Sequence, residues 1–231
     1  MNFVSHFYLD RQRSADSRFF LGVITPDLVG IFDRRIKLKP HTMPEILPEH
    51  LSLPQLAFYT GVQRHFEADA VFHTCDFFLE ETRELVSRLR VHFEEDQLPR
   101  SYFLAHILVE LILDKVLMKA HPEILPEFYG HLGSIPYQEQ LLLTEWVCGT
   151  PMHRYQAYMM RFLEKQYLYD YAEWRHILFV MRRILDKVNI STGDTLHHPN
   201  MLRVLREYES KLMDTWPSLF QEMNQKMQKL P

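Results

Sequence analysis

Apolar residues recur along almost the whole chain at positions three and four apart, the spacing of one face of an α-helix. No run of residues shows the alternation of apolar and polar positions that is typical of a half-buried strand. The pattern predicts helices over residues 2–9, 15–23, 55–93 with one break, 99–120, 123–131, 135–148, 151–166, 170–188 and 199–228. The predicted fold class is therefore all-α, a single-domain helical bundle.

Turn-forming residues separate these helices. Thr25-Pro26-Asp27 predicts a break, with Thr25 as a helix N-cap and Pro26 at the first helical position. The prolines of residues 33–54 predict a long irregular connection, and the polar segment 189–200 predicts a loop. A length of 231 residues favours one domain over 1–231, with helices of residues 123–228 packed around a site built from residues 1–120.

Composition narrows the class of protein. Hydrophobic residues make up 46% of the chain and charged residues 24%, which is typical of a globular domain and excludes disorder. A net charge of −4 carries no basic excess that would indicate nucleic-acid binding. The first residues do not resemble a signal peptide, no apolar run is long enough to span a membrane, and the two cysteines form no disulfide framework. We therefore expect a cytoplasmic protein, and the sequence leaves its oligomeric state open.

The predicted helix over 55–93 carries ionisable residues on its apolar face. His65, Asp69 and His73 follow one another at intervals of four residues. At 100° per residue they occupy a stripe about 80° wide, and Phe58 and Phe72 lie within or beside it. The stripe is therefore expected to face the interior, where histidine and carboxylate side chains need partners.

The predicted helix over 99–120 repeats this pattern. Its apolar residues surround the helix, which indicates that it is buried, yet His106, Glu110 and Asp114 occur at the same four-residue interval. Buried carboxylates are almost always paired or bound to a metal. We expect His106 and Glu110 to be metal ligands, and Asp114 to pair with a lysine or to cap a neighbouring helix instead.

His6, in an apolar N-terminal segment, and Asp27 extend the set. Seven residues are predicted metal ligands: His6, Asp27, His65, Asp69, His73, His106 and Glu110. This number predicts two or three divalent ions with bridging carboxylates, and the abundance of histidine favours zinc over manganese or magnesium. Asp27 and Asp69 are the candidate catalytic residues, as bridging ligands or as groups that orient an attacking water.

Three motifs resemble those of the acyl-carrier-protein phosphodiesterase family. They are Met1-Asn2-Phe3 with His6, Gly22-x4-Asp27 and Gly61-x3-His65-x3-Asp69. The resemblance covers about the first 115 residues. It implies an all-α protein, distantly related to HD-domain phosphohydrolases, that uses a divalent metal, typically manganese, to hydrolyse the phosphodiester between phosphopantetheine and a serine of the carrier protein. Asp27 matches the motif aspartate of this family, and His65 and Asp69 match its His-x3-Asp pair.

The remaining ligand candidates are similar to a second family. Acyl-carrier-protein phosphodiesterases tend to carry a carboxylate where this chain has His73, and two aspartates where it has His106 and Glu110. By contrast, His-x3-Asp followed by His and a later His-x3-Glu, with an early His and Asp, is similar to zinc-dependent phospholipase C and related single-strand nucleases. Those all-α enzymes hold three zinc ions, are normally secreted and use an N-terminal tryptophan that this chain lacks. Both resemblances imply metal-assisted hydrolysis of a phosphodiester, with an acyl carrier protein or a phospholipid as the substrate.

Two other classes of protein remain open. A non-catalytic helical module would use the same residues as a buried polar network or for one structural ion, but a closed structural zinc site needs only four ligands. A di-metal oxygenase-like bundle would need Glu-x2-His pairs, and none occurs on the predicted stripes.

Outside the stripes, three features are weaker candidates. The loop after Asp27 carries four cations within the six residues 34–39 (Arg34, Arg35, Lys37 and Lys39). They either attract a phosphate or an acidic carrier protein or belong to a solvated loop. Arg64 is expected to be a surface charge because it faces away from the stripe. Cys75 and Cys148 are expected to be unreactive core thiols.

Overall fold

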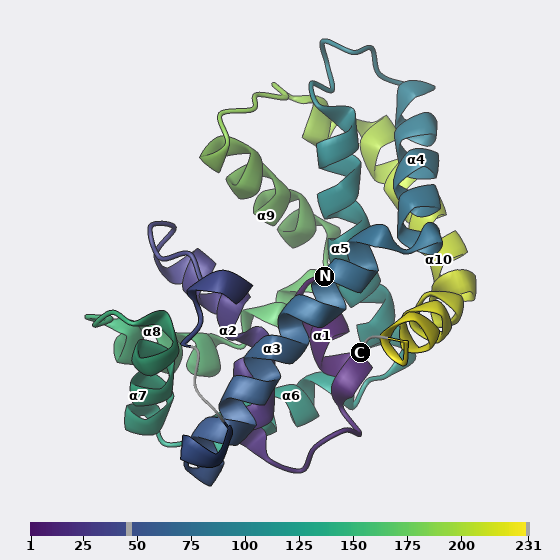
Figure 1. The fold of residues 1–231 in the computed structure, drawn as a ribbon. Coiled ribbons are helices and arrows are strands. Elements are labelled where there is room, and N and C mark those ends of the chain that lie inside the picture. The colour runs from purple at the N-terminus through teal and green to yellow at the C-terminus, as the bar shows by residue number, and fades with distance from the viewer. Residues whose placement is uncertain (45–47, 230–231) are drawn as a thin grey trace. The chain divides into compact units, whose positions relative to one another are not determined.

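The computed structural model describes residues 1–44 and 48–229 (Figure 1). Within these residues the chain forms ten α-helices and four short 3-10 helices, and no strand. The prediction of an all-α protein is confirmed. None of the described helices combines the length and the apolar character that crossing a bilayer would require.

The chain divides into two compact units, each made of two stretches of sequence. The first unit contains Met1–Ala70 and Glu123–Tyr167, and the second contains Val71–Pro122 and Leu168–Pro231. The prediction of a single domain stays a prediction.

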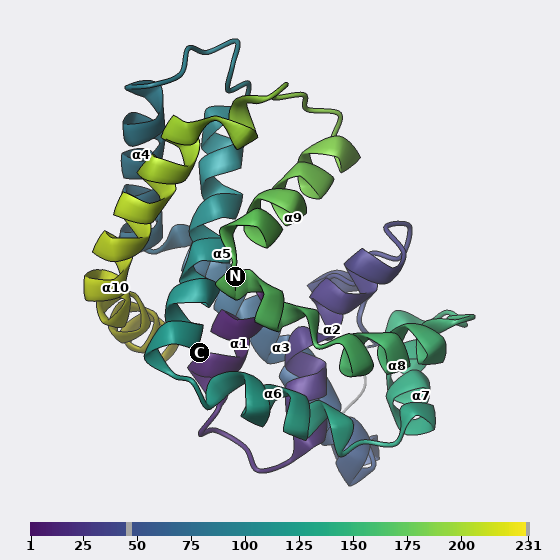
Figure 2. The same ribbon diagram turned by 180° about the vertical axis from the view of Figure 1, so that it is seen from behind.

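The first unit contains the N-terminal helices and the three that follow residue 122. Its elements are α1 (Phe3–Asp10), α2 (Ser17–Phe32), η1 (Pro40–Thr42), η2 (Pro48–His50), most of α3 (Leu53–Thr74), α6 (Ile124–Gly133), α7 (Tyr137–Cys148) and α8 (Tyr155–Lys165). Helices α1, α2 and α6 pack against one another, and α7 packs against α8 (Figure 2). Phe7 contacts both Phe20 and Phe128, so aromatic rings from these three helices form part of the core.

The second unit is organised around α5. Its elements are the end of α3 from Val71, α4 (Asp76–Arg90), α5 (Ser101–Ala120), η3 (Tyr167–Ala172) from Leu168, α9 (Trp174–Lys187), η4 (Thr195–His197) and α10 (Pro199–Met227). Helices α4, α5 and α10 pack pairwise and run side by side (Figures 1 and 2), and α9 packs on α5. This enclosure explains why the sequence of α5 is apolar on all sides.

The predicted helix break at Thr25-Pro26 is wrong, because α2 continues through Pro26 to Phe32. Proline inside a helix costs about 3 kcal/mol in isolation. Here Thr25 and Leu28, on either side of the Pro26-Asp27 pair, are buried, and the hydroxyl of Thr25 donates to the carbonyl of Leu21 at 2.7 Å. Tertiary packing therefore outweighs the local preference, and Asp27 lies on the helix itself.

The break expected in the predicted helix over 55–93 is confirmed. Helix α3 ends at Thr74 and α4 begins at Asp76, with Cys75 in extended conformation between them.

Two glycines allow α2 and α3 to approach until their backbones touch. A Cβ on Gly22 would lie 2.1 Å from the carbonyl oxygen of Phe58, and a Cβ on Gly61 would lie 2.0 Å from that of Phe19. Any larger residue at either position requires the two backbones to separate. The crossing places Val23 beside His65, which positions that histidine.

The prediction that Arg64 is a surface charge is wrong. Its side chain is buried, and its Nε donates to both carboxylate oxygens of Asp10, at 2.9 and 3.0 Å. Burial raises the pKa of Asp10, and the guanidinium of Arg64 partly offsets that rise. Asp10 is the last residue of α1, so a helix distant in sequence supplies the carboxylate that the buried guanidinium of Arg64 requires.

Asp16 caps the start of α2, and its removal is expected to cost about 1 kcal/mol of unfolding free energy. Its carboxylate accepts a hydrogen bond from the backbone N–H of Arg18 at 2.9 Å. Urea denaturation of Asp16→Ala measures this loss. Asp16→Asn keeps the acceptor and is the matched control, so equal stability of the two variants would contradict the capping role.

Candidate functional site

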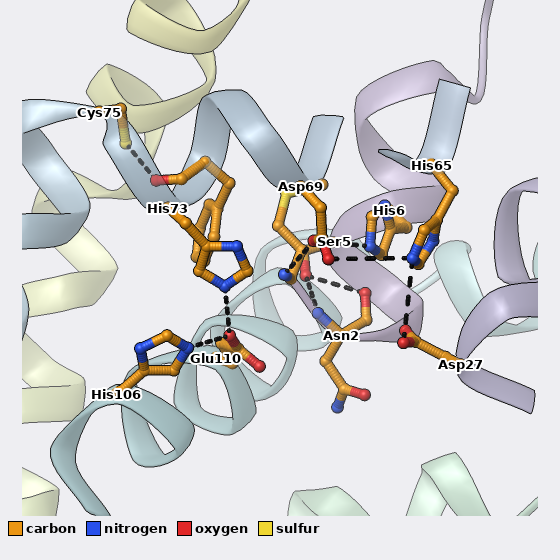
Figure 3. Close-up of polar contacts among 12 residues, drawn as sticks. Asn2, Ser5, His6, Asp27, His65, Asp69, His73, Cys75, His106 and Glu110 are labelled. Carbon is orange, nitrogen blue, oxygen red and sulfur yellow. Dashed lines mark hydrogen bonds and ion pairs between the residues drawn. The ribbon is translucent and has the colours of Figure 1, made fainter. Parts of the chain in front are cut away.

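The seven predicted ligands occur in two sets, each within one unit (Figure 3). The first donor group consists of His6, His65 and Asp69, with Asp27 beside it. The second donor group consists of His73, His106 and Glu110. In each three-residue group, one potential ligand atom from every side chain lies within 4.8 Å of the others.

The first donor group joins α1 to α3. The Nε2 atom of His6 lies 3.3 Å from Oδ1 of Asp69, and the rings of His6 and His65 stack with their centroids 4.1 Å apart. The two histidines are 1% and 3% exposed, whereas the side chain of Asp69 is 31% exposed. Two buried imidazoles and one solvent-accessible carboxylate therefore converge at this point.

The backbone of α2 sets the proton position on His65. Its Nδ1 lies 2.8 Å from the carbonyl oxygen of Val23, which can only accept a hydrogen bond. In the neutral ring Nδ1 therefore carries the proton, and Nε2 keeps its lone pair. This is the arrangement in which histidine ligands are commonly held by a second partner.

The lone pair of His65 faces two carboxylates. Its Nε2 lies 3.8 Å from Oδ2 of Asp69 and 4.0 Å from Oδ1 of Asp27, and both distances are too long for a hydrogen bond (Figure 3). Ligand atoms bound to one tetrahedral zinc ion are about 3.4 Å apart, given bonds of about 2.0–2.1 Å. Asp69 and Asp27 thus each direct a carboxylate oxygen toward Nε2 of His65, at distances wider than a shared ion would impose.

The protonation states within this group suit a metal ligand set. Burial lowers the pKa of His65 well below its ordinary value, and the adjacent ring of His6 lowers that pKa further. Burial alone would raise the pKa of Asp69, but the terminal amine of Met1, 2.6 Å away, and His6 outweigh it and bring the pKa below its ordinary value. At neutral pH His65 is therefore neutral and Asp69 ionised, as metal binding requires.

The second donor group joins the end of α3 to α5. The Nε2 atoms of His73 and His106 lie 3.1 and 3.0 Å from the same oxygen, Oε1 of Glu110, and the two rings stack with centroids 4.9 Å apart. Burial would raise the pKa of Glu110, but within this unit the hydrogen bonds from the two histidines lower that pKa. Two histidines and one glutamate form a ligand set that is known from catalytic zinc sites.

Neither donor group contains Asp114, which is fully buried on α5. The sequence did not predict that the backbone carbonyl of Val23 positions His65, because every residue type has such an acceptor. The available signal was the pair Gly22 and Gly61, whose lack of side chains permits the helix contact that brings this carbonyl to His65.

A scan against protein-family models and searches of curated proteins and of solved structures found no match to this chain. The resemblance to acyl-carrier-protein phosphodiesterases therefore rests on its motif residues. Of these, the structure places Asp27, His65 and Asp69 close together within one unit.

Proposed function

We propose that the protein is a metal-dependent phosphodiester hydrolase in which each donor group binds a divalent ion. The observation that carries this proposal is the unprotonated Nε2 of His65 directed toward the carboxylates of Asp69 and Asp27. Carboxylates and an imidazole lone pair this close together favour a cation, and the terminal amine of Met1 already lies 2.6 Å from Oδ1 of Asp69.

The donor types fit zinc best. Both groups combine two histidine nitrogens with a carboxylate, and imidazole ligands favour zinc over magnesium or calcium. Three protein ligands leave a coordination position open for water, a feature of catalytic rather than structural zinc sites. Manganese, which the resemblance implies, is the alternative ion.

Each residue of the first donor group has a role in this proposal. A bound divalent ion supplies acidity to a coordinated water and neutralises charge on the phosphate oxygens. Asp69, His65 and His6 hold the ion, and Val23 orients His65 through its carbonyl. Asp27 is partly exposed on α2, so its carboxylate can accept a proton from the attacking water.

Metal analysis is the first test of this proposal. We expect at least two equivalents of zinc or manganese in protein purified without an affinity tag, measured by elemental analysis. His65→Ala is expected to lose the ion of the first donor group and His106→Ala that of the second, because each removes one of three ligands. The double variant is expected to lose both ions.

His153→Ala is the control, because this histidine is exposed and outside both groups. We expect it to keep the full metal content. The contrary result is that the wild-type protein holds no metal, even after reconstitution, and that His65→Ala and His106→Ala only lower its stability. That result would identify the two groups as buried polar networks and refute the hydrolase.

The substrate is tested by two arms on the metal-loaded protein. Release of phosphopantetheine from a holo acyl carrier protein would support the first resemblance, and release of a phosphorylated headgroup from a phospholipid would support the second. If the metal-loaded protein hydrolyses neither substrate and no chromogenic phosphodiester, catalysis is contradicted. The protein would then be a non-catalytic metal-binding module.

A further inference from the structure

A cavity of about 510 Å³ lies in the first unit where α2 gives way to the basic segment of residues 33–42. Its size falls within the range of small-molecule binding sites. Residues of this segment form one part of the wall, and Cys148, Thr150 and Pro151, at and beyond the end of α7, form another.

One side of the cavity carries positive charge. The Nε and Nη2 atoms of Arg35 donate to the carboxylate of Asp33 at 2.9 and 2.6 Å, and this arginine lowers the pKa of Asp33 to about 2. Asp33 is the one carboxylate among the described residues of the lining, and its neighbour therefore neutralises it. Lys37 also lines the cavity and has no carboxylate partner among the described residues, which leaves it available to an anion.

The rest of the lining is largely apolar. Ile36 and Leu38 are half-buried in the wall. Burial raises the pKa of the Cys148 thiol to about 11, so this side chain is uncharged at neutral pH. A cationic edge beside an apolar wall fits a ligand that has both an anionic group and an apolar body.

Internal hydrogen bonds define the conformation of this segment. The Thr42 hydroxyl accepts from the backbone N–H of Lys39 at 2.9 Å, and the backbone N–H groups of Arg35 and Ile36 bond to Asp33 at 3.0 and 2.9 Å. These internal bonds restrain the wall, which reduces the entropic cost of binding.

We propose that this cavity binds an organic anion, a phosphate or carboxylate group attached to an apolar body. Asp33 follows Asp27 by six residues along α2, a rise of about 9 Å. The bound anion would then be a non-reacting part of the substrate, held one to two helical turns from Asp27. That link to catalysis rests on the proposed function, whereas the binding itself does not.

The test uses the metal-free full-length chain, so that its outcome does not depend on metal binding. Phenyl phosphate is the probe, and protection of Cys148 from N-ethylmaleimide, followed by mass spectrometry, is the readout. Cys75 is fully buried and serves as the internal reference. We expect phenyl phosphate to slow the labelling of Cys148 at least fivefold at saturation, and benzoate in a parallel arm distinguishes a phosphate site from a carboxylate site.

Lys37→Ala is expected to raise the half-protecting concentration of phenyl phosphate about tenfold, as expected for loss of a charge-assisted contact. Lys39→Ala is the matched control, since Lys39 is exposed in the same segment but does not line the cavity, and it should leave protection unchanged. Absence of protection, equal protection by phenol or by inorganic phosphate, or equal weakening in both variants would overturn the proposal. Any of these results would leave the metal analysis unaffected, so the two proposals fail separately.

Discussion

The Asp69→Asn variant is expected to hydrolyse bis(p-nitrophenyl) phosphate with a kcat/KM at least about 100-fold below that of the wild-type protein. The amide keeps the shape of the carboxylate but removes the negative charge that lies 3.3 Å from His6 and 3.8 Å from His65. Loss of this charge weakens the attraction for a divalent ion, so the metal content of the first donor group should fall in parallel. Steady-state kinetics with a saturating metal supplement separates weaker metal binding from slower chemistry.

Glu67→Gln is the matched control for that experiment. It makes the same carboxylate-to-amide change two residues away on α3, where the side chain is half exposed and pairs with Arg64 at 3.5 Å. We expect its activity and metal content to equal those of the wild-type protein. If Asp69→Asn also retained wild-type activity, the reaction would not occur at the first donor group.

Replacing Gly22 by alanine is expected to lower the free energy of unfolding by about 3 kcal/mol, the upper part of the range for overpacked sites. The new methyl group would lie 2.1 Å from the carbonyl oxygen of Phe58. Both atoms belong to or adjoin helical backbone, so no side-chain rotation relieves the clash and α2 must move away from α3. That movement also separates Val23 from His65, and metal affinity should therefore fall in the folded variant.

Gly130→Ala provides the control for this prediction. Gly130 lies within α6 in the same unit, and a Cβ there would meet no atom within 4 Å. Alanine favours a helix by up to about 1 kcal/mol over glycine, so this variant should be as stable as the wild-type protein or more so. Denaturant unfolding of both variants is the measurement, and equal stability of Gly22→Ala and the wild-type protein would contradict the close contact of α2 and α3.

Much of the candidate site can be predicted from spacing within single helices. His65 and Asp69, and likewise His106 and Glu110, are four residues apart, and helix geometry alone places such side chains on one face. The sequence does not show which stripe meets which partner. His6 stacks on His65 only because α1 packs within the first unit, a contact between residues 59 positions apart.

The exposure of a side chain cannot be predicted from its position on a single helix. Arg64 falls on the polar side of α3 in a helical projection, yet Asp10 from the end of α1 meets it there and buries it. A projection describes only the direction of a side chain, whereas burial depends on what the rest of the fold brings to that side.

Helical periodicity and turn preferences act over a few residues, and they are enough to predict the all-α class, one break within residues 55–93 and the histidine–carboxylate pairs. Tertiary structure alone decided that α2 continues through Pro26 and that the Val23 carbonyl holds His65. It also decided how the predicted ligands divide into two donor groups. These features depend on contacts between segments distant in the chain, whose packing energy exceeds the local preference of any one residue.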